Sequence, residues 1–530
     1  MLLQYYHTLR YLKPIQWRCR ILYTLRNRWR KWTGFRYPAA RIPWQVVGVK
    51  MIPSVQRPSM WQVENNRMEW LNLPHVFGEK VNWNCSLYGK LWTYNLHYFE
   101  YLTCAGVDPS AAEALLLDFV RALPQTPAAN EPYPISLRLL FWIRFFSSHQ
   151  IQNDALDHAL YAQAYALLDQ RELHLLGNHY LENGFGLLFA AYRYQDAVLY
   201  RQAEKILKNE LAEQVLADGG HFELSPMYHQ IILYRLLDAY NLVDNNPELF
   251  AGALKPLLGQ KAGLMLGWLQ QITFANGDIP LLNDAALGVA PATSALIEYA
   301  QRLKIAPIVK PLMESGYRKI DKPGFQVVMD IGKVGPDYIA GHAHSDTLGF
   351  ELHAKGHPML VDTGISTYDK NERRQLERAT AAHNTVIINE QDQTEVWGGF
   401  RVARRAYPII TADGPTCWKA THTGYDAMNV RHWRSFEVKQ DVFQILDEIQ
   451  PYKVAVLPGY TATACFHFHP AVVFIDCGAD YIETDLGKII FEGLLTWELL
   501  EYAYSPRFNV RLKAQKAVVH FRDQLLTTIQ

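Results

Sequence analysis

The chain has 530 residues, a formal net charge of zero, and 14 Trp, 30 Tyr and 23 Phe. This length predicts two or three domains, each with its own core. The balance of 52 basic and 52 acidic residues argues against a dedicated nucleic-acid-binding protein, which is usually basic overall. The six cysteines are scattered without CxxC pairs, which excludes a disulfide framework and a zinc-finger pattern. The aromatic excess suits a sugar-binding cleft and a large core equally well.

The N-terminal stretch has an unusual charge pattern. Its first 63 residues contain twelve Lys and Arg residues and no Asp or Glu, with aromatic residues interleaved. Residues 1–36 are predicted to be helical, and residues 37–90, rich in Pro and Trp, to be irregular. A basic aromatic helix can lie on an anionic membrane surface or contact a polyanionic glycan. The alternative is a solvated helical arm packed on the main body. Residues 1–90 are assigned as a basic, Trp- and Pro-rich N-terminal arm, for which peripheral membrane contact stays open.

Targeting signals are not evident in the sequence. No run of about 18 apolar residues occurs, so we expect no membrane-spanning helix. The N-terminus lacks the short apolar core and small-residue cleavage site of a secretory signal. The periplasm and the cytoplasmic face of a bacterial envelope both stay open as locations.

From about residue 91 the chain shows a long series of amphipathic segments separated by Pro, Gly or Asn-rich breaks. Helices are expected near residues 109–123, 135–149, 154–173, 179–195, 198–217, 226–244, 248–273 and 292–304. Consecutive helices of this size indicate antiparallel pairs arranged as an α/α toroid or solenoid. We assign residues 91–320 to this toroid.

After about residue 320 the apolar pattern changes to short alternating runs with Gly, Pro and Asp between them. Strands are expected at residues 325–330, 338–342, 348–354, 385–389, 402–406, 442–450, 462–469, 472–476, 488–492 and 516–521. Many short strands with frequent turns predict an antiparallel β-sandwich, here over residues 321–530. The fold class is therefore an α+β multidomain protein.

A first cluster of candidate site residues lies in the strand region. His342 and His344 alternate in Gly-His-Ala-His-Ser-Asp, so on a strand they would project to the same face. Asp362 and His383 follow and can converge on them. Two imidazoles and a carboxylate are a Zn²⁺ ligand set that leaves one position open, and a fourth group is then free for proton chemistry. The alternative is that these histidines are packed and hydrogen-bonded without a metal.

A second cluster lies in the helical region. Asn178, His179 and Glu182 share one face at the start of a predicted helix, where Asn178 could instead serve only as the N-cap. Tyr228 falls in the first turn of a helix that begins at Ser225-Pro226. A tyrosine there usually packs; if its hydroxyl is exposed, the helix dipole would lower its pKa by favouring the phenolate.

Four stretches resemble the heparinase II/III family of polysaccharide lyases, which is related to alginate and oligoalginate lyases. They are Trp92–Phe99, the Asn178-His179-x-x-Glu182-Asn183 motif, Asp218–Tyr228, and an ordered block from Gly341 to Arg401. The resemblance covers nearly the whole chain from about residue 90. It implies a helical toroid followed by a β-sandwich, with the substrate cleft between them.

The resemblance also implies residue roles. Tyr228 matches the catalytic tyrosine, and His342 matches the histidine that shares proton transfer with it. Asn178 and His179 match the pair that contacts and neutralises the substrate carboxylate, with Glu182 as a supporting acid. A structural Zn²⁺ is implied at three further positions, which are His344, Asp362 and His383.

The implied reaction is the cleavage of a uronic-acid-containing polysaccharide by β-elimination. The proton on C5 lies next to a carboxylate, so its removal needs nearby donors to offset the added negative charge. Tyr228 could act as base, acid or both, with His342 as the alternative base. Three alternatives stay open: a uronate C5 epimerase or other modifying enzyme of envelope polysaccharide assembly, an inverting glycosidase using Glu182 and Glu223, and a non-catalytic glycan-binding protein.

Overall fold

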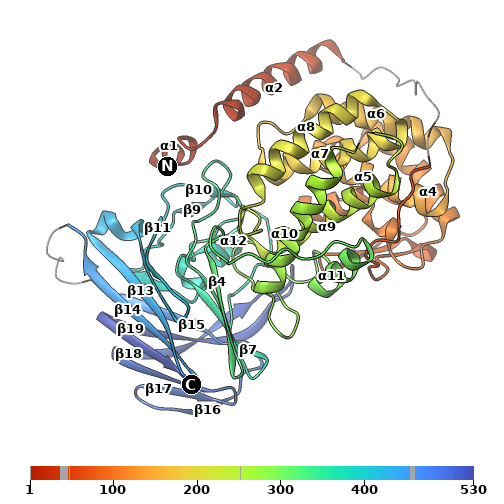
Figure 1. The fold of residues 1–530 in the computed structure, drawn as a ribbon. Helices are drawn as coiled ribbons and strands as arrows, with labels where there is room; N and C mark the ends of the chain where they lie inside the picture. The colour runs from red at the N-terminus through yellow and green to blue at the C-terminus, as the bar shows by residue number, and fades with distance from the viewer. Residues whose placement is uncertain (1, 36–45, 47, 251, 454–459) are drawn as a thin grey trace.

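The computed structural model describes residues 2–35, 46, 48–250, 252–453 and 460–530, and it has a helical region followed by a β domain (Figure 1). The helices of the main helical region are α3 (Gly89–Tyr98), α4 (Pro109–Ala122), α5 (Pro132–His149), α6 (Asp154–Gln170), α7 (Gly177–Tyr194), α8 (Ala197–Gln214), α9 (Pro226–Asn245), α10 (Leu254–Ile272) and α11 (Thr293–Arg302). They form an α/α toroid. The eight helices predicted between residues 109 and 304 are confirmed, with ends within about three residues except that α10 begins at residue 254 and not at 248.

The helices begin where polar side chains cap their first turns. Asp108, Asn153, Asp196 and Ser225 each accept a hydrogen bond from a backbone N–H at the start of α4, α6, α8 and α9, respectively. Helices α5, α7 and α9 are buried on nearly every side, whereas α6 and α8 bury only one face. The toroid therefore has an apolar inner layer, and the amphipathic helices cover it.

The β domain begins at β4 (Tyr317–Lys322) and contains two antiparallel sheets. The smaller sheet has the order β4, β5 (Phe325–Asp330), β6 (Phe350–Ala354) and β7 (His357–Leu360). The larger sheet has the order β11 (Pro408–Asp413), β12 (Cys417–His422), β13 (Val430–Lys439), β14 (Val442–Pro451), β19 (Leu512–Ile529), β18 (Lys488–Tyr504), β17 (Tyr481–Thr484) and β16 (Phe474–Cys477). On the larger sheet, β15 (Ala462–His467) pairs with both β19 and β8 (Val386–Ile388).

The two sheets pack face to face. Val327 and Phe350 of the smaller sheet share one apolar cluster with Phe436, Phe443 and Val519 of the larger one. The predicted antiparallel β-sandwich is therefore confirmed, and alternate residues of β13 and β14 point into its core.

Several local predictions differ from the structure. Of the strand predicted at residues 402–406, only residue 402 is in a strand, at the end of β10 (Arg401–Val402). The predicted strand at residues 338–342 is wrong, because this segment lies in the loop between β5 and β6, where Ile339 packs against Gly177 of the toroid instead of pairing with a strand. Residues 37–90 are not entirely irregular, since residues 61–76 form the small sheet β1 (Trp61–Gln62), β2 (Arg67–Trp70) and β3 (Leu73–Val76). The short helix α12 (Glu372–Arg378) was not predicted.

The basic N-terminal segment forms two helices that touch both regions of the protein (Figure 1). Helix α1 (Leu2–Leu9) lies against the hairpin β9 (Val396–Trp397) and β10 (Arg401–Val402), where the indole of Trp397 donates to Thr8 Oγ1 at 3.1 Å. Helix α2 (Pro14–Thr33) follows the loop between α6 and α7, where the Tyr23 hydroxyl donates to the carbonyl of Arg171 at 2.8 Å. Within the described ranges, no helix is long and apolar enough to span a membrane.

Close packing between α5 and α7 depends on Gly186. A Cβ atom at this position would lie 2.8 Å from the backbone of Ser136, closer than two such atoms approach in proteins. We expect Gly186→Ala to lower the free energy of unfolding by about 1–3 kcal/mol, because the two helices must separate. Chemical denaturation would measure this.

Gly324 is the matched control for this substitution. It lies in a turn with open space around its Cα and has no positive φ, so Gly324→Ala should change stability by less than about 0.5 kcal/mol. Equal effects of the two substitutions would contradict the packing argument.

Candidate active site

Tyr228 and His342 face each other across the boundary between the toroid and the β domain. Their ring centroids are 3.9 Å apart, with an angle of 33° between the planes. Tyr228 is fixed in the first turn of α9, where its N–H donates to the Ser225 side chain. His342 comes from the loop between β5 and β6, and Tyr368 donates to the Tyr228 hydroxyl at 3.4 Å. The structure thus brings together the predicted phenol and imidazole from distant parts of the sequence.

The Tyr228 hydroxyl keeps its proton at neutral pH. Its enclosed position raises the pKa well above the ordinary value, and the neighbouring Tyr368, Asp284 and Glu223 raise it further. The expectation of a lowered pKa from the helix dipole is therefore wrong, because desolvation and nearby carboxylates outweigh the dipole. The phenol is poised to donate a proton.

Asn178 holds the carboxylate of Glu223. Its side-chain amide donates to both oxygens of Glu223, at 3.0 and 2.9 Å, and its backbone N–H donates to one of them at 3.1 Å. The residue that caps α7 is Leu176, so the alternative that Asn178 serves as the N-cap is wrong. Glu223 Oε2 also lies 3.6 Å from Nε2 of His342. Asn178, Glu223 and His342 therefore form one connected polar group.

His179 is a partly exposed histidine beside this group. Burial alone would lower the pKa of His179, but the charge of Glu172 and a hydrogen bond to it raise the value above its usual range. The Nδ1 atom lies 3.0 Å from Glu172, and the ring centroid lies 4.5 Å from that of Tyr133, with the two planes tilted by 48°. Sequence reasoning missed Glu172, although it precedes the Asn178 motif by only six residues.

Glu182 lies one turn deeper in the toroid. Its carboxylate is 3.3 Å from Nε of Arg235 on α9, and both side chains are buried. Burial raises the pKa of Glu182 to about 7, against the opposing effect of Arg235. This predicted supporting acid is therefore paired with an arginine that the sequence analysis did not single out.

Asp284, in the segment between α10 and α11, binds both histidines of the His-x-His pair. It accepts a hydrogen bond from Nδ1 of His342 at 2.8 Å and one from Nε2 of His344 at 2.9 Å. Arg374 of α12 donates to both oxygens of the same carboxylate. The two histidines thus converge as predicted, but from a loop and onto a carboxylate that sequence reasoning missed.

Burial would raise the pKa of Asp284, but Arg374, His342 and His344 hold it well below its ordinary value. The carboxylate is therefore ionised at neutral pH. The only sequence signal for Asp284 is a polar Asn-Asp pair after the apolar Ile279–Leu282 run, and such a pair is common in turns.

Comparison with known proteins shows which family the chain belongs to. The model of the heparinase II/III N-terminus matches residues 135–307, and the model of the heparinase II/III-like C-terminal domain matches residues 305–529. The chain belongs to the heparinase II/III-like family. The boundary between the two matched parts falls just before β4.

Two curated members of the family are similar to this chain. A heparin-sulfate lyase of Pedobacter heparinus is 27% identical over 450 residues, which cover 73% of this chain and 61% of that protein. A heparin-sulfate lyase of Bacteroides stercoris is 26% identical over 322 residues, covering 52% of this chain and 45% of that protein. The chain thus spans less than two thirds of the length of either relative.

Solved heparinase structures share the fold. A crystal structure of heparinase III superposes with a TM-score of 0.70 at 16% identity, covering 97% of this chain and 91% of that one. A heparan sulfate lyase from Pedobacter heparinus gives a TM-score of 0.55 at 19% identity, covering 88% and 81%. These likenesses support the toroid followed by a sandwich.

The residues at the predicted metal positions lie close together in the β domain. The Nδ1 atom of His383 lies 2.6 Å from Asp362, and the rings of His344 and His383 are 5.2 Å apart. Three buried polar atoms there have no hydrogen-bond partner: Nδ1 of His344, Nε2 of His383 and Oδ2 of Asp346. Across the described part of the chain, no three His, Cys, Asp or Glu side chains are already arranged around one point as a metal requires.

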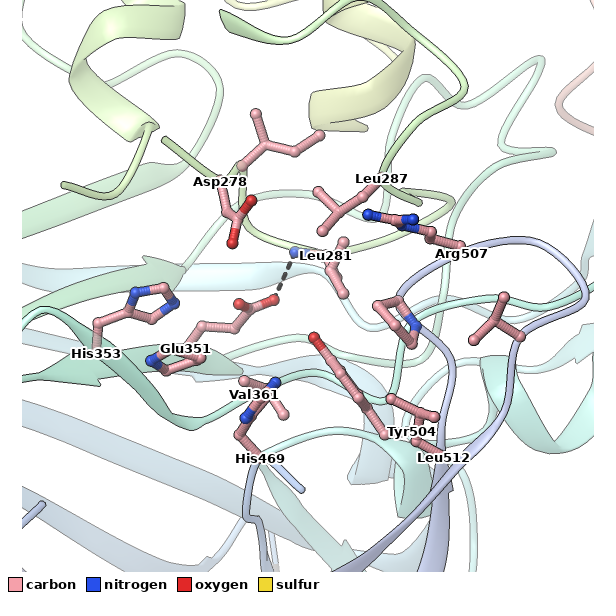
Figure 2. Close-up of a pocket in the computed structure, with 14 residues that line it drawn as sticks. Asp278, Leu281, Leu287, Glu351, His353, Val361, His469, Tyr504, Arg507 and Leu512 are labelled. Atoms are coloured by element: carbon pink, nitrogen blue, oxygen red, sulfur yellow. Dashed lines mark hydrogen bonds between the residues drawn. The ribbon is translucent and has the colours of Figure 1, made fainter. Parts of the chain in front are cut away.

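A separate cavity of about 340 Å³ lies between residues 278–287 and the β domain (Figure 2). Glu351 of β6 accepts a hydrogen bond there from the Leu281 N–H, and burial raises the pKa of this carboxyl well above its ordinary value. Leu281 and Leu287 line the cavity, whereas Asp284 between them faces the histidines. None of the predicted catalytic or metal residues, all of which are described, lines this cavity.

Asp284 is expected to contribute strongly to stability. Because Asp284→Ala would leave the buried Arg374 guanidinium without its partner, we expect the free energy of unfolding to fall by about 3–5 kcal/mol in chemical denaturation. The control is Glu213→Ala, which removes an ion pair with Lys13 at the surface. That loss should stay below about 1 kcal/mol, and a similar loss for both variants would contradict the role of Asp284.

Proposed function

We propose that this protein is a polysaccharide lyase that cleaves a uronic-acid-containing glycan by β-elimination. The observation that carries the proposal is the close contact between the rings of Tyr228 and His342, beside the polar group of Asn178 and Glu223. Membership of a family with curated heparin-sulfate lyases supports the same reaction class. The substrate class we propose is an acidic polysaccharide of the glycosaminoglycan type.

The reaction needs one base and one acid. The base removes the C5 proton of the uronate, and the electron pair of that C–H bond becomes the C4–C5 double bond. The bond from C4 to the glycosidic oxygen breaks, and its electron pair leaves with the oxygen. The acid supplies the proton that this oxygen takes up. Each of these proton transfers typically contributes about 10²–10⁴-fold to the rate.

His342 is the proposed base. Asp284 is ionised and accepts the proton on Nδ1, so Nε2 of His342 carries the free electron pair. Removal of the C5 proton by Nε2 produces an imidazolium between Asp284 and Glu223, whose carboxylates offset its charge. The ionised Asp284 thus positions the base and stabilises its protonated form, as carboxylates beside catalytic histidines do.

Tyr228 is the proposed acid. Because its pKa is raised, the phenol carries the proton that the leaving oxygen requires. The contact of its ring with His342 keeps acid and base within the dimensions of one sugar unit. This assignment separates the two roles that the sequence analysis leaves open for Tyr228.

His179 and Asn178 are proposed to bind the uronate carboxylate. The raised pKa of His179 favours the imidazolium, which would offset the charge that develops as C5 loses its proton. The Asn178 amide is bonded to Glu223 in this structure, so the substrate carboxylate must compete with Glu223 for it. Glu182, which lies deeper in the toroid, would stabilise His179 and Arg235 without contacting the substrate.

Tyr228→Phe tests the assignment of the acid. We expect kcat on heparan-type or other uronate polymers to fall by about 10²–10⁴-fold, because the leaving oxygen loses its proton donor. The assay is ultraviolet absorbance of the new C4–C5 double bond. Tyr240→Phe, a half-buried tyrosine on the same helix, is the control and should retain full activity.

Isotope exchange and product analysis distinguish the alternative functions. Deuterium uptake at C5 without chain cleavage would identify a C5 epimerase. A non-catalytic glycan-binding protein would yield no product with any acidic glycan. Full activity of Tyr228→Phe would exclude this acid. A glycosidase has less support, since Glu182 is paired with Arg235 and Glu223 with Asn178.

We propose in addition that His344, Asp362 and His383 hold a structural Zn²⁺. The donor set fits, because two imidazoles and a carboxylate are common zinc ligands and one nitrogen of each histidine is buried without a partner. The Nε2 atom of His344 donates to Asp284, which leaves Nδ1 free for a metal. Bound Zn²⁺ would supply a structural link beside the loop that carries His342.

Elemental analysis of the purified protein tests the zinc proposal. We expect about one Zn²⁺ per chain, and removal by a chelator should lower Tm because a structural zinc stabilises the fold. His383→Ala should lose the metal, whereas the control His469→Ala, in the separate cavity, should keep it. Metal-free protein with a Tm unaffected by chelator would contradict the proposal.

Contact of the basic N-terminal arm with a membrane is a separate proposal. It concerns helices α1 and α2 and none of the residues of the proposed active site.

A further inference from the structure

Helix α2 uses only one face to pack on the protein. Gln16 and Cys19 are buried on this face. Tyr23 bonds to the carbonyl of Arg171, and Arg26 and Arg30 pair with Asp169. These residues recur every three or four positions, so they form a single stripe along the helix. The stripe follows the loop between α6 and α7.

The opposite face of α2 is apolar and exposed. Its large side chains are Trp17 (41% exposed), Ile21 (59%), Leu22 (48%), Leu25 (57%), Trp29 (56%) and Trp32 (84%). Helix α1 also has exposed apolar side chains, among them Leu2, Leu3 and Tyr6. We name these nine residues the outer face of the arm. Contiguous exposed apolar patches of this kind mark interaction sites, because water penalises them.

Positive charge lies on and beside the outer face. Arg18, Arg28 and Lys31 are exposed on α2, and Arg10 is exposed just after α1. The first 63 residues contain no acidic side chain that would offset these charges. A helix with tryptophan and leucine on one face and Arg and Lys beside them is typical of peptides that lie in the interface of an anionic membrane.

We propose that the outer face of the arm docks on an anionic phospholipid surface, with the tryptophans and leucines in the interface and the basic residues at the headgroups. Charge complementarity favours this partner over a second copy, since two such arms would bring like charges together. The apolar face favours a bilayer over a soluble polyanionic glycan, which offers no apolar interior for Ile21 and Leu25.

Docking would place the cleft close to the membrane. Gln16 donates to the carbonyl of Leu175, two residues before α7 begins and three before Asn178. The proposed lipid-binding surface is therefore the opposite face of α2, the helix that packs next to the motif beginning at Asn178. This inference goes beyond the proposed lyase activity and does not depend on it.

Co-sedimentation of the full chain with vesicles tests the proposal. We expect binding to vesicles that contain phosphatidylglycerol and much weaker binding to pure phosphatidylcholine, with the difference reduced at high salt. The variant Leu25→Ser/Trp29→Ser/Trp32→Ser should bind at least about 10-fold more weakly, because it removes apolar area that enters the interface. The charge variant Arg18→Glu/Arg28→Glu should lose the preference for phosphatidylglycerol.

The matched control is Val473→Ser/Ile475→Ser in the β domain, where the side chains are 59% and 63% exposed and lie far from the arm in sequence. This variant should bind vesicles like the parent chain. Thermal unfolding of each variant would confirm that the fold is retained.

Four outcomes would overturn the proposal. The first three are no binding to anionic vesicles, binding that the triple variant does not weaken, and a concentration-dependent dimer that the triple variant abolishes while no vesicle binding is seen. Binding of heparin without binding of vesicles would assign the arm to a glycan and would also overturn it. Activity of the triple variant on a soluble glycan is measured in parallel, so failure of membrane binding is distinguishable from failure of the lyase proposal.

Discussion

One buried carboxylate joins the two halves of this protein. Asp284 belongs to the helical region, and its three partners, His342, His344 and Arg374, belong to the β domain. An ionised carboxylate is costly to bury, and only a full set of donors offsets that cost. The toroid and the sandwich must therefore meet in the one arrangement that brings all three donors to Asp284. The same arrangement places Tyr228 against His342.

Asp284 therefore takes part both in the contact between the two domains and in the proposed proton transfer. Arg374 pairs with both oxygens of Asp284, and the hydrogen bond from Nδ1 orients the imidazole of His342. On the other side, Glu223 is held by Asn178 and faces the second nitrogen of the same ring. The imidazole lies between two carboxylates, one fixed by an arginine and the other by an amide. Such an environment holds the ring in one orientation.

Local patterns predicted much of the fold, because helices and strands reflect nearby residues. The cap at Ser225 and Pro226 located α9, and the alternation at residues 442–450 located β14. Long-range effects were not predictable. The run at residues 338–342 alternates like a strand, but Ile339 packs on the toroid, and the pKa of Tyr228 depends on burial and on the distant Tyr368. Asp284 lies in a connection without periodicity, so only its partners reveal its importance.

The two N-terminal helices restrict how far the two domains can rotate apart. Helix α1 is attached to Trp397 of the β domain, and α2 is attached to the loop before α7 of the toroid. A hinge rotation that separated the two domains would pull these anchor points apart, and a helix cannot lengthen without breaking its backbone hydrogen bonds. Wide opening therefore requires α1 to detach or the chain to unwind near Pro14, so the arm acts as a tether that limits hinge amplitude.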